Sequence, residues 1–272
     1  MANQKVSKDK EVKTGAAAQV RPVEKKKEAI VDAPDKEAMG MAGKDVVKHK
    51  IAVVFYYDNV FYKLAQLELA IRSWKRFFCD RFDLYVIGDE VKIDGVISIP
   101  MKPDKRFGRS LANALNLAVM EDNISKEFIF TLPDIFLVNA ICTDYIRIPK
   151  FAEFLKADDA TLVLLRGAGF FTAHSYSGNT GTPVLVDKDI FIALSGVLAL
   201  DMTDVFTPLV YAHAKTLPVH LQWRTDPWLL PVVSDMADTS LFDQLAPSKC
   251  FVSNRPDAWT ERLRRRLEKI IG

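Results

Sequence analysis

Three aspartates in this sequence each follow an apolar segment of strand length, a position in which a carboxylate can bind a metal ion or a polar ligand. Asp58 follows IAVVFYY, Asp89 follows FDLYVI and a glycine, and Asp134 follows EFIFTL and a proline. The carboxyl ends of parallel strands share one edge of a sheet, where ligands bind. Mg²⁺ or Mn²⁺ at such an edge uses one or two carboxylates together with the oxygens of a diphosphate. The alternative is that each aspartate only caps the turn that follows it.

Basic and polar side chains elsewhere could complete such a site. Arg106, Arg109 and Asn113 lie close together at the start of a predicted helix. They could bind a phosphate or sugar hydroxyls, or they could form an exposed basic helix face. His174 lies in the polar loop of residues 167–181, where it could be an acid or base, a phosphate ligand, or incidental.

A short aromatic and charged segment is suited in composition to binding a sugar. Trp223, Arg224 and Asp226 stand close together in the sequence. An aromatic face next to a planar hydrogen-bond donor suits a polyhydroxy ring. The alternative is that Trp223 belongs to the core. The arginines at positions 264–266 form either a solvated helix face or a contact with anionic lipid or polymer.

Apolar patterns predict the elements that would position these side chains. Predicted strands occupy residues 51–57, 82–87, 96–99, 127–132 and 161–165, and predicted helices occupy residues 61–78, 109–120, 151–156, 187–200 and 258–271. Strand and helix alternate at intervals typical of βαβ units. We therefore expect an α/β domain whose sheet is largely parallel and is flanked by helices.

Composition narrows the classes of function. The 272 residues carry a net charge of +2, so no nucleic-acid partner is indicated. No apolar run is long enough to predict a transmembrane segment. The three cysteines, Cys79, Cys142 and Cys250, have no disulfide or metal-site spacing, which indicates a reducing compartment and favours a cytoplasmic location. Residues 1–50 are charged and poor in aromatics, and we expect a disordered tail there, followed by one domain at residues 51–272.

Signature motifs of dehydrogenases, P-loop proteins, serine hydrolases and zinc enzymes do not occur in the sequence. Five other blocks are informative as an ordered set: LELAIRSWKRF, DLYVIGD, ISKEFIFTLPDIFLVN, GTPVLVDKDIF and CFVSNRPDAWTERLRRRLEKIIG, which begin at positions 67, 83, 124, 181 and 250. Together they resemble small glycosyltransferase-like proteins of bacteria and phages, related to the Stealth family of capsular polysaccharide phosphotransferases. The resemblance implies a GT-A-like fold, the Rossmann-type fold of nucleotide-diphospho-sugar transferases, with a mixed, mostly parallel sheet.

The resemblance also implies a function and assigns roles to individual residues. The reaction would transfer a sugar from a nucleotide-activated donor to a glycan or another hydroxyl acceptor. Asp134 matches the second acid of the family's metal-binding pair and would bind Mn²⁺ or Mg²⁺, while Pro133 replaces the first acid. Asp58 and Asp89 would contact the nucleotide.

Further roles and two further functions remain open. Asp187 or Asp189 would deprotonate the acceptor hydroxyl if either faces the site. Gly181 replaces the histidine that precedes the family's Thr-Pro, and His174 is the nearby substitute. One alternative function is hexose-1-phosphate transfer of the Stealth type. The other is a non-catalytic sugar- or nucleotide-binding module, which Pro133 and Gly181 favour.

Overall fold

The chain divides into two units, Met1–Gly43 and Lys44–Gly272. The computed structural model describes residues 50–147, 183–198, 229–232, 240–254 and 258–272, all of them in the second unit. The predicted tail up to residue 49, the predicted elements at 151–156 and 161–165, and the loop at 167–181 lie outside the described residues.

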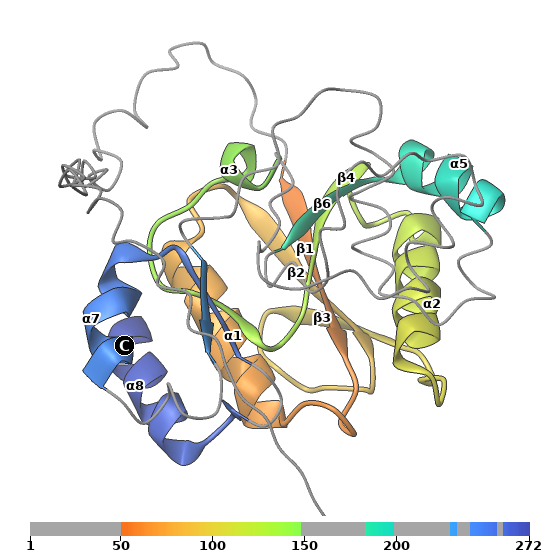
Figure 1. The fold of residues 1–272 in the computed structure, drawn as a ribbon. Helices are drawn as coiled ribbons and strands as arrows, with labels where there is room; N and C mark the ends of the chain where they lie inside the picture. The colour runs from red at the N-terminus through yellow and green to blue at the C-terminus, as the bar shows by residue number, and fades with distance from the viewer. Residues whose placement is uncertain (1–49, 148–182, 199–228, 233–239, 255–257) are drawn as a thin grey trace, which may run out of the picture. The chain divides into compact units, whose positions relative to one another are not determined.

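A five-stranded sheet forms the centre of the second unit (Figure 1). Its strands are β1 (Ile51–Tyr57), β2 (Phe82–Gly88), β3 (Val96–Pro100), β4 (Glu127–Thr131) and β6 (Val184–Asp187), in the spatial order β3-β2-β1-β4-β6. Neighbouring strands are parallel from β3 to β4, and β6 is antiparallel to β4. The predicted mixed, mostly parallel sheet flanked by helices is confirmed.

The apolar character of β1 follows from helices that cover both faces of the sheet. All seven residues of β1 are buried. Phe55 packs against Trp74 of α1 (Leu64–Phe77), with ring centroids 6.3 Å apart. The next residue, Tyr56, packs against Phe107 of α2 (Phe107–Met120) at 5.9 Å. Because successive side chains of a strand point to opposite faces, α1 and α2 cover opposite faces of the sheet.

A second, smaller sheet was not predicted from the sequence. It consists of β5 (Ile135–Leu137), β8 (Phe251–Asn254) and β7 (Leu229–Val232), in the order β5-β8-β7. β8 is antiparallel to β5 and parallel to β7. Helix α1 joins this sheet to the first one: Ser73 Oγ accepts the Leu137 N–H at 3.0 Å, and Gln66 Nε2 donates to Asn254 Oδ1 at 3.1 Å.

The remaining described elements are short helices and the amphipathic helix near the end of the chain. They are α3 (Thr143–Arg147), α5 (Lys188–Leu198), α7 (Ser240–Leu245), the 3₁₀ turn Ala246–Ser248 and α8 (Glu261–Ile271). The helix predicted at 258–271 begins only at Glu261, because Thr260 caps it: Thr260 Oγ1 accepts the Leu263 N–H at 3.2 Å. None of the helices in the described ranges combines the length and apolarity needed to cross a bilayer.

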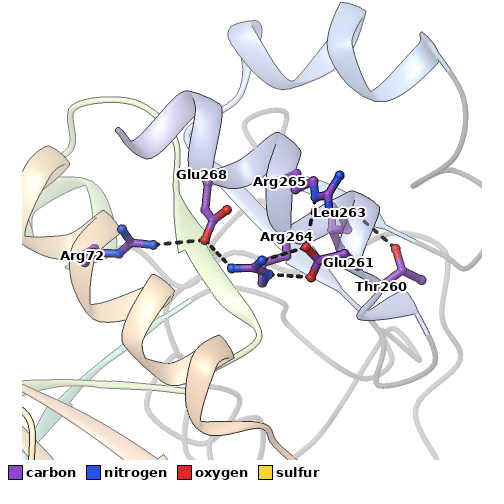
Figure 2. Close-up of polar contacts among 7 residues, drawn as sticks. All are labelled: Arg72, Thr260, Glu261, Leu263, Arg264, Arg265 and Glu268. Carbon is purple, nitrogen blue, oxygen red and sulfur yellow. Dashed lines mark hydrogen bonds and ion pairs between the residues drawn. The ribbon is translucent and has the colours of Figure 1, made fainter.

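Ion pairs hold one face of α8 (Figure 2). The Arg264 guanidinium donates to Glu261 and to Glu268, each at 2.7 Å, and Glu268 also pairs with Arg72 of α1 at 3.5 Å. The opposite face is apolar and is buried through Leu263, Leu267 and Ile271. Arg265 also pairs with Glu261 at 3.0 Å, and Arg266 pairs with Asp243 at 3.5 Å. These ion pairs within the protein agree with a solvated helix face and leave the alternative, contact with anionic lipid or polymer, a prediction.

Candidate functional site

The parallel strands bring the three predicted strand-end carboxylates to one edge of the first sheet. β1, β2 and β4 run in the same direction, and Asp58, Asp89 and Asp134 follow their carboxyl ends. The strand order places Asp58 between the other two. β3 ends at the same side and is followed by the basic segment of residues 102–106. We refer to this side of the sheet as the carboxyl edge.

Asp58 shapes the loop between β1 and α1. It is buried, with 2% of its surface exposed. Its Oδ1 accepts the Val60 N–H at 2.8 Å, and its Oδ2 accepts the Tyr56 hydroxyl at 3.2 Å. Burial, reinforced by the Asp58 charge, raises the pKa of Tyr56 far above its ordinary value, so this tyrosine remains a hydrogen-bond donor. The carboxylate therefore fixes the turn, as the capping alternative predicted, and adds negative charge to the carboxyl edge.

Asp89 holds the same loop from the next strand. Its Oδ2 accepts the Asn59 N–H at 2.8 Å, and its own N–H donates to the Tyr57 carbonyl at 2.9 Å. The preceding residue, Gly88, has φ +133°, and a Cβ there would overlap the Tyr57 carbonyl oxygen. A glycine is thus required for β2 to end this close to β1. Asp89 itself remains partly exposed.

Asp134 is the least compensated carboxyl of the three. Only 5% of its surface is exposed, and its Oδ1 has no hydrogen-bond partner among the described residues. Burial raises its pKa to about 7, and no cation among the described residues offsets the loss of hydration. Its carbonyl oxygen accepts the Asn254 N–H at 3.1 Å, so β8 fixes its backbone. Thr131 Oγ1, three residues earlier, is likewise buried without a partner among these residues.

Aromatic side chains that were not predicted as site residues lie near Asp58 and Asp134. The Phe107 ring contacts Phe61 at 4.8 Å and Tyr62 at 6.4 Å. Burial raises the pKa of Tyr62 well above its ordinary value, and the negative charge of Asp134 is the second-largest cause of the rise. Tyr56 could have been identified from the sequence, because residues two apart on a strand share a face and Asp58 follows it by two. No local signal identifies Tyr62.

The basic segment after β3 forms an open pocket at the same edge of the sheet. The pocket has a volume of about 590 Å³ and is lined by Lys102, Pro103, Asp104, Lys105, Arg106 and Asn113. Arg106 and Arg109 both pair with Asp104 at 3.7 Å. The hydrogen bond from the Arg106 N–H lowers the pKa of Asp104, and the positive charges of Arg109 and Arg106 contribute a smaller lowering. Arg106 and Asn113 thus meet at one pocket, whereas Arg109 lies beside it through its ion pair.

The structure separates Asp187 and Asp189 from the carboxyl edge. Because β6 is antiparallel to β4, Asp187 lies opposite Glu127 in the strand register. Glu127 is the first residue of β4, so Asp187 is at the other edge of the sheet from the carboxyl edge. Asp187 Oδ1 accepts the Ile190 N–H at 3.0 Å and caps α5, while Asp189 pairs with Lys126 at 2.5 Å. A role in deprotonating the acceptor required that Asp187 or Asp189 face the carboxyl edge. Neither does. The predicted helix began at 187 because the four-residue strand β6 was not recognised.

Four other predicted site residues cannot be placed. His174, Trp223, Arg224 and Asp226 lie outside the described residues. Their roles in acid–base chemistry and sugar binding therefore stay predictions.

The donors at the carboxyl edge fit a divalent ion only in part. The described ranges contain no group of three or more His, Cys, Asp or Glu side chains arranged to hold a metal. The unpartnered Asp134 Oδ1 is nevertheless a suitable single donor. Mg²⁺ and Mn²⁺ commonly take one or two carboxylates and complete their shell with substrate oxygens and water. The fit thus depends on a ligand that brings its own oxygens.

No protein-family model and no curated protein sequence matches the chain. Among solved structures it is similar to the glycosyltransferase GlyE of Streptococcus pneumoniae TIGR4, with 14% identity and TM-scores of 0.41 and 0.43 in two structures, over 82% of this chain and 60% of GlyE. It is also similar to a glycosyltransferase involved in glycosylation of the major capsid of PBCV-1, with 14% identity and a TM-score of 0.45, over 81% of this chain and 99% of that one. The chain thus spans less than two thirds of GlyE. Likeness at this level does not establish a shared activity.

Proposed function

We propose that this protein transfers a glycosyl group from a nucleotide-activated sugar to a hydroxyl acceptor at the carboxyl edge. The observation that carries the proposal is the convergence of three strand-end acids on one edge, with a buried oxygen on Asp134 that has no partner among the described residues. A buried carboxyl without compensation destabilises a fold, and such groups concentrate at functional sites. The resemblance of the ordered sequence blocks to GT-A glycosyltransferase-like proteins supports the same function.

In this proposal the chain's own residues bind and orient the donor. Asp134 would hold Mn²⁺ or Mg²⁺ through Oδ1, and that ion would neutralise charge on the departing diphosphate. Lys102, Lys105 and Arg106, which line the pocket after β3, would add positive charge near the same phosphates. Asp89, partly exposed at the end of β2, would contact the nucleoside. Asp58 would position the β1–α1 loop that faces the donor.

A non-catalytic nucleotide- or sugar-binding module is the second candidate. Pro133 stands where the resemblance implies a first metal-binding acid. Burial also raises the pKa of Asp134 to about 7, which favours its protonated form, and a protonated carboxyl binds a cation less well. Both observations weaken metal binding without removing the pocket.

The first test measures binding of uridine, guanosine and cytidine diphosphates by thermal shift, with and without Mn²⁺. A ligand that binds only the folded state raises Tm by mass action. We expect a Mn²⁺-dependent rise with one nucleotide in the wild type, its loss in Asp134→Asn, and its retention in Asp189→Asn at the opposite edge. Each variant is compared with its own ligand-free Tm, because the substitutions also change stability.

A second measurement separates transfer from binding. The nucleotide that binds is supplied as its sugar conjugates, and release of free nucleoside diphosphate is followed over time. Slow release that requires Asp134 supports glycosyl transfer, because many transferases hydrolyse the donor slowly when water replaces the acceptor. Binding without release supports the binding module. No shift with any nucleotide contradicts the proposal.

A further inference from the structure

A short β-bridge outside the named strands brings two of the three cysteines together. Phe78 pairs with Ile141 in parallel orientation. The Ile141 N–H donates to the Phe77 carbonyl at 3.0 Å, and the Cys79 N–H donates to the Ile141 carbonyl at 2.8 Å. The carbonyl carbon of Ile141 is bonded to the Cys142 nitrogen, so the hydrogen bond that the Cys79 N–H donates brings the backbones of Cys79 and Cys142 next to each other. Cys79 and Cys142, the residues after the bridging pair, are therefore neighbours across the two segments.

A hydrogen bond after the two cysteines and the burial of the residues before them support the placement of Cys79 beside Cys142. One residue further on, the Thr143 N–H donates to Asp80 Oδ2 at 2.7 Å. The bridging pair is buried, whereas Cys79 is exposed and Cys142 is partly exposed. Successive side chains of extended chain point to opposite sides. The alternation thus places both thiols on the outer side of the bridge, accessible to small molecules.

The position of one sulfur agrees with this arrangement. Cys79 Sγ lies 3.8 Å from the Phe77 carbonyl oxygen, which also accepts the Ile141 N–H across the bridge. The sulfur therefore lies close to the atoms that join the two segments. Neighbouring strands lie about 4.8 Å apart, within the Cα separation of roughly 4.4–6.8 Å that a disulfide spans.

We propose that Cys79 and Cys142 form a reversible dithiol–disulfide site that reacts with low-molecular-weight disulfides. The thiolate of Cys79, the more exposed of the two, attacks the S–S bond of oxidised glutathione, forms a mixed disulfide and releases one glutathione thiolate. The thiolate of Cys142 then attacks the Cys79 sulfur and displaces the second glutathione. The protein loses two electrons and two protons, and the oxidant is reduced to two glutathione thiols.

Oxidation at this site would cross-link the end of α1 to the start of α3. The closed segment, roughly 60 residues, contains β2, β3, β4 and β5 together with Asp134, and cross-links that close long segments restrict the unfolded chain most. The oxidised protein should therefore unfold at a higher temperature. This inference does not depend on the proposed function, because it rests on the bridge alone.

Peptide mapping after thiol–disulfide exchange tests the site. The reduced full chain is equilibrated with mixtures of oxidised and reduced glutathione, remaining thiols are alkylated, and peptides are mapped without reduction. We expect a peptide pair joined through Cys79 and Cys142, and a rise in Tm on the order of 5 to 10 °C. Both effects should reverse with dithiothreitol.

Variants at the three cysteines provide matched controls. Cys250→Ser changes the buried third thiol and should retain the cross-link and the Tm rise. Cys142→Ser should lose both and retain glutathione on Cys79. The redox conditions are those under which glutathione modifies Cys79 in Cys142→Ser. If the wild type under these conditions yields Cys79 and Cys142 only as alkylated thiols or as separate glutathione adducts, the proposal is overturned. A cross-link between two chains, seen as a covalent dimer, also overturns it. The map of the wild type remains decisive if a variant fails to fold.

Discussion

At the scale of single residues, Asp134 combines burial, an unpartnered oxygen and a raised pKa. A structural carboxyl in such a position would normally have a hydrogen-bonding partner, because burying a charge without one is costly. Asp58 and Asp89 show that contrast, since both accept backbone N–H groups. Asp134 Oδ1 accepts nothing from the described residues. A carboxyl such as Asp134, whose burial lowers the stability of the fold, is expected at a functional site, where a bound ligand supplies the missing hydrogen-bond or metal partner.

The raised pKa of Asp134 gives a testable pH dependence of stability. Its pKa rises from an ordinary 3.8 to about 7 on folding, so the folded state binds more protons than the unfolded state between these values. The free energy of unfolding should therefore fall as pH rises through this window, by up to about 4 kcal/mol, and level off above it. Urea unfolding in metal-free buffer across the range measures this.

Asp134→Asn should remove that pH dependence and stabilise the protein at about pH 8 relative to the wild type. Asp189→Asn, at an exposed acid on the opposite edge, should leave the wild-type profile in place. If the wild type and Asp134→Asn have parallel profiles between about pH 4 and 7, then Asp134 ionises normally in the fold and the buried site is incorrect.

Gly88 offers a second prediction at this scale, on the backbone that positions Asp89. Gly88→Ala should destabilise the protein by more than about 3 kcal/mol, because a Cβ at φ +133° would overlap the Tyr57 carbonyl. Gly196→Ala in α5 is the matched control: its Cβ would meet nothing within 4 Å, so it should be neutral or stabilise by up to about 1 kcal/mol. Chemical denaturation compares the two. Equal effects would contradict the close approach of β2 to β1.

At the scale of elements, long apolar runs were predictable and short strands were not. β1 and β4 were recognised because nearly all of their residues are buried, and a strand buried on both faces is apolar at nearly every position. β6 and β8 have four residues each and β5 has three, and their pairing partners lie far away in the sequence. Because β6 was not predicted, its antiparallel pairing with β4, which puts Asp187 at the opposite edge from the other acids, was not predicted either. The three acids at the carboxyl edge were predictable from strand ends, whereas the burial of Tyr62 near Asp134 depends on tertiary packing.

The cap of α8 gives a prediction about one element. Thr260→Ala removes the side-chain oxygen that accepts the Leu263 N–H (Figure 2). Loss of such a cap costs about 1 kcal/mol, and here it should also weaken the contact of α8 with α1. Thr260→Ser retains the oxygen and should lose only a few tenths of a kcal/mol. Guanidinium unfolding of both variants measures the difference. A Thr260→Ser loss as large as that of Thr260→Ala would assign the effect to the methyl group instead.

At the scale of the whole second unit, α1 connects the two sheets. One side of it packs on β1 through Trp74 and Phe55, and hydrogen bonds from Ser73 and Gln66 reach β5 and β8. β8, late in the sequence, pairs with β5, which directly follows Asp134. The backbone of the proposed metal ligand is therefore fixed by a segment more than a hundred residues away.

This shared helix predicts that both sheets unfold together. Trp74 reports on the first sheet, and Trp259, stacked on Phe136 at 5.7 Å, reports on the second. Two variants that each retain only one of these tryptophans, with the others changed to Phe, are unfolded in urea and followed by fluorescence and far-ultraviolet circular dichroism. Within each variant the two signals should have the same midpoint, because neither sheet can lose α1 without exposing its apolar face. An earlier fluorescence transition in the Trp259 variant alone would show that the second sheet opens first, and that the carbonyl contact of Asn254 with Asp134 can break while the first sheet stays folded.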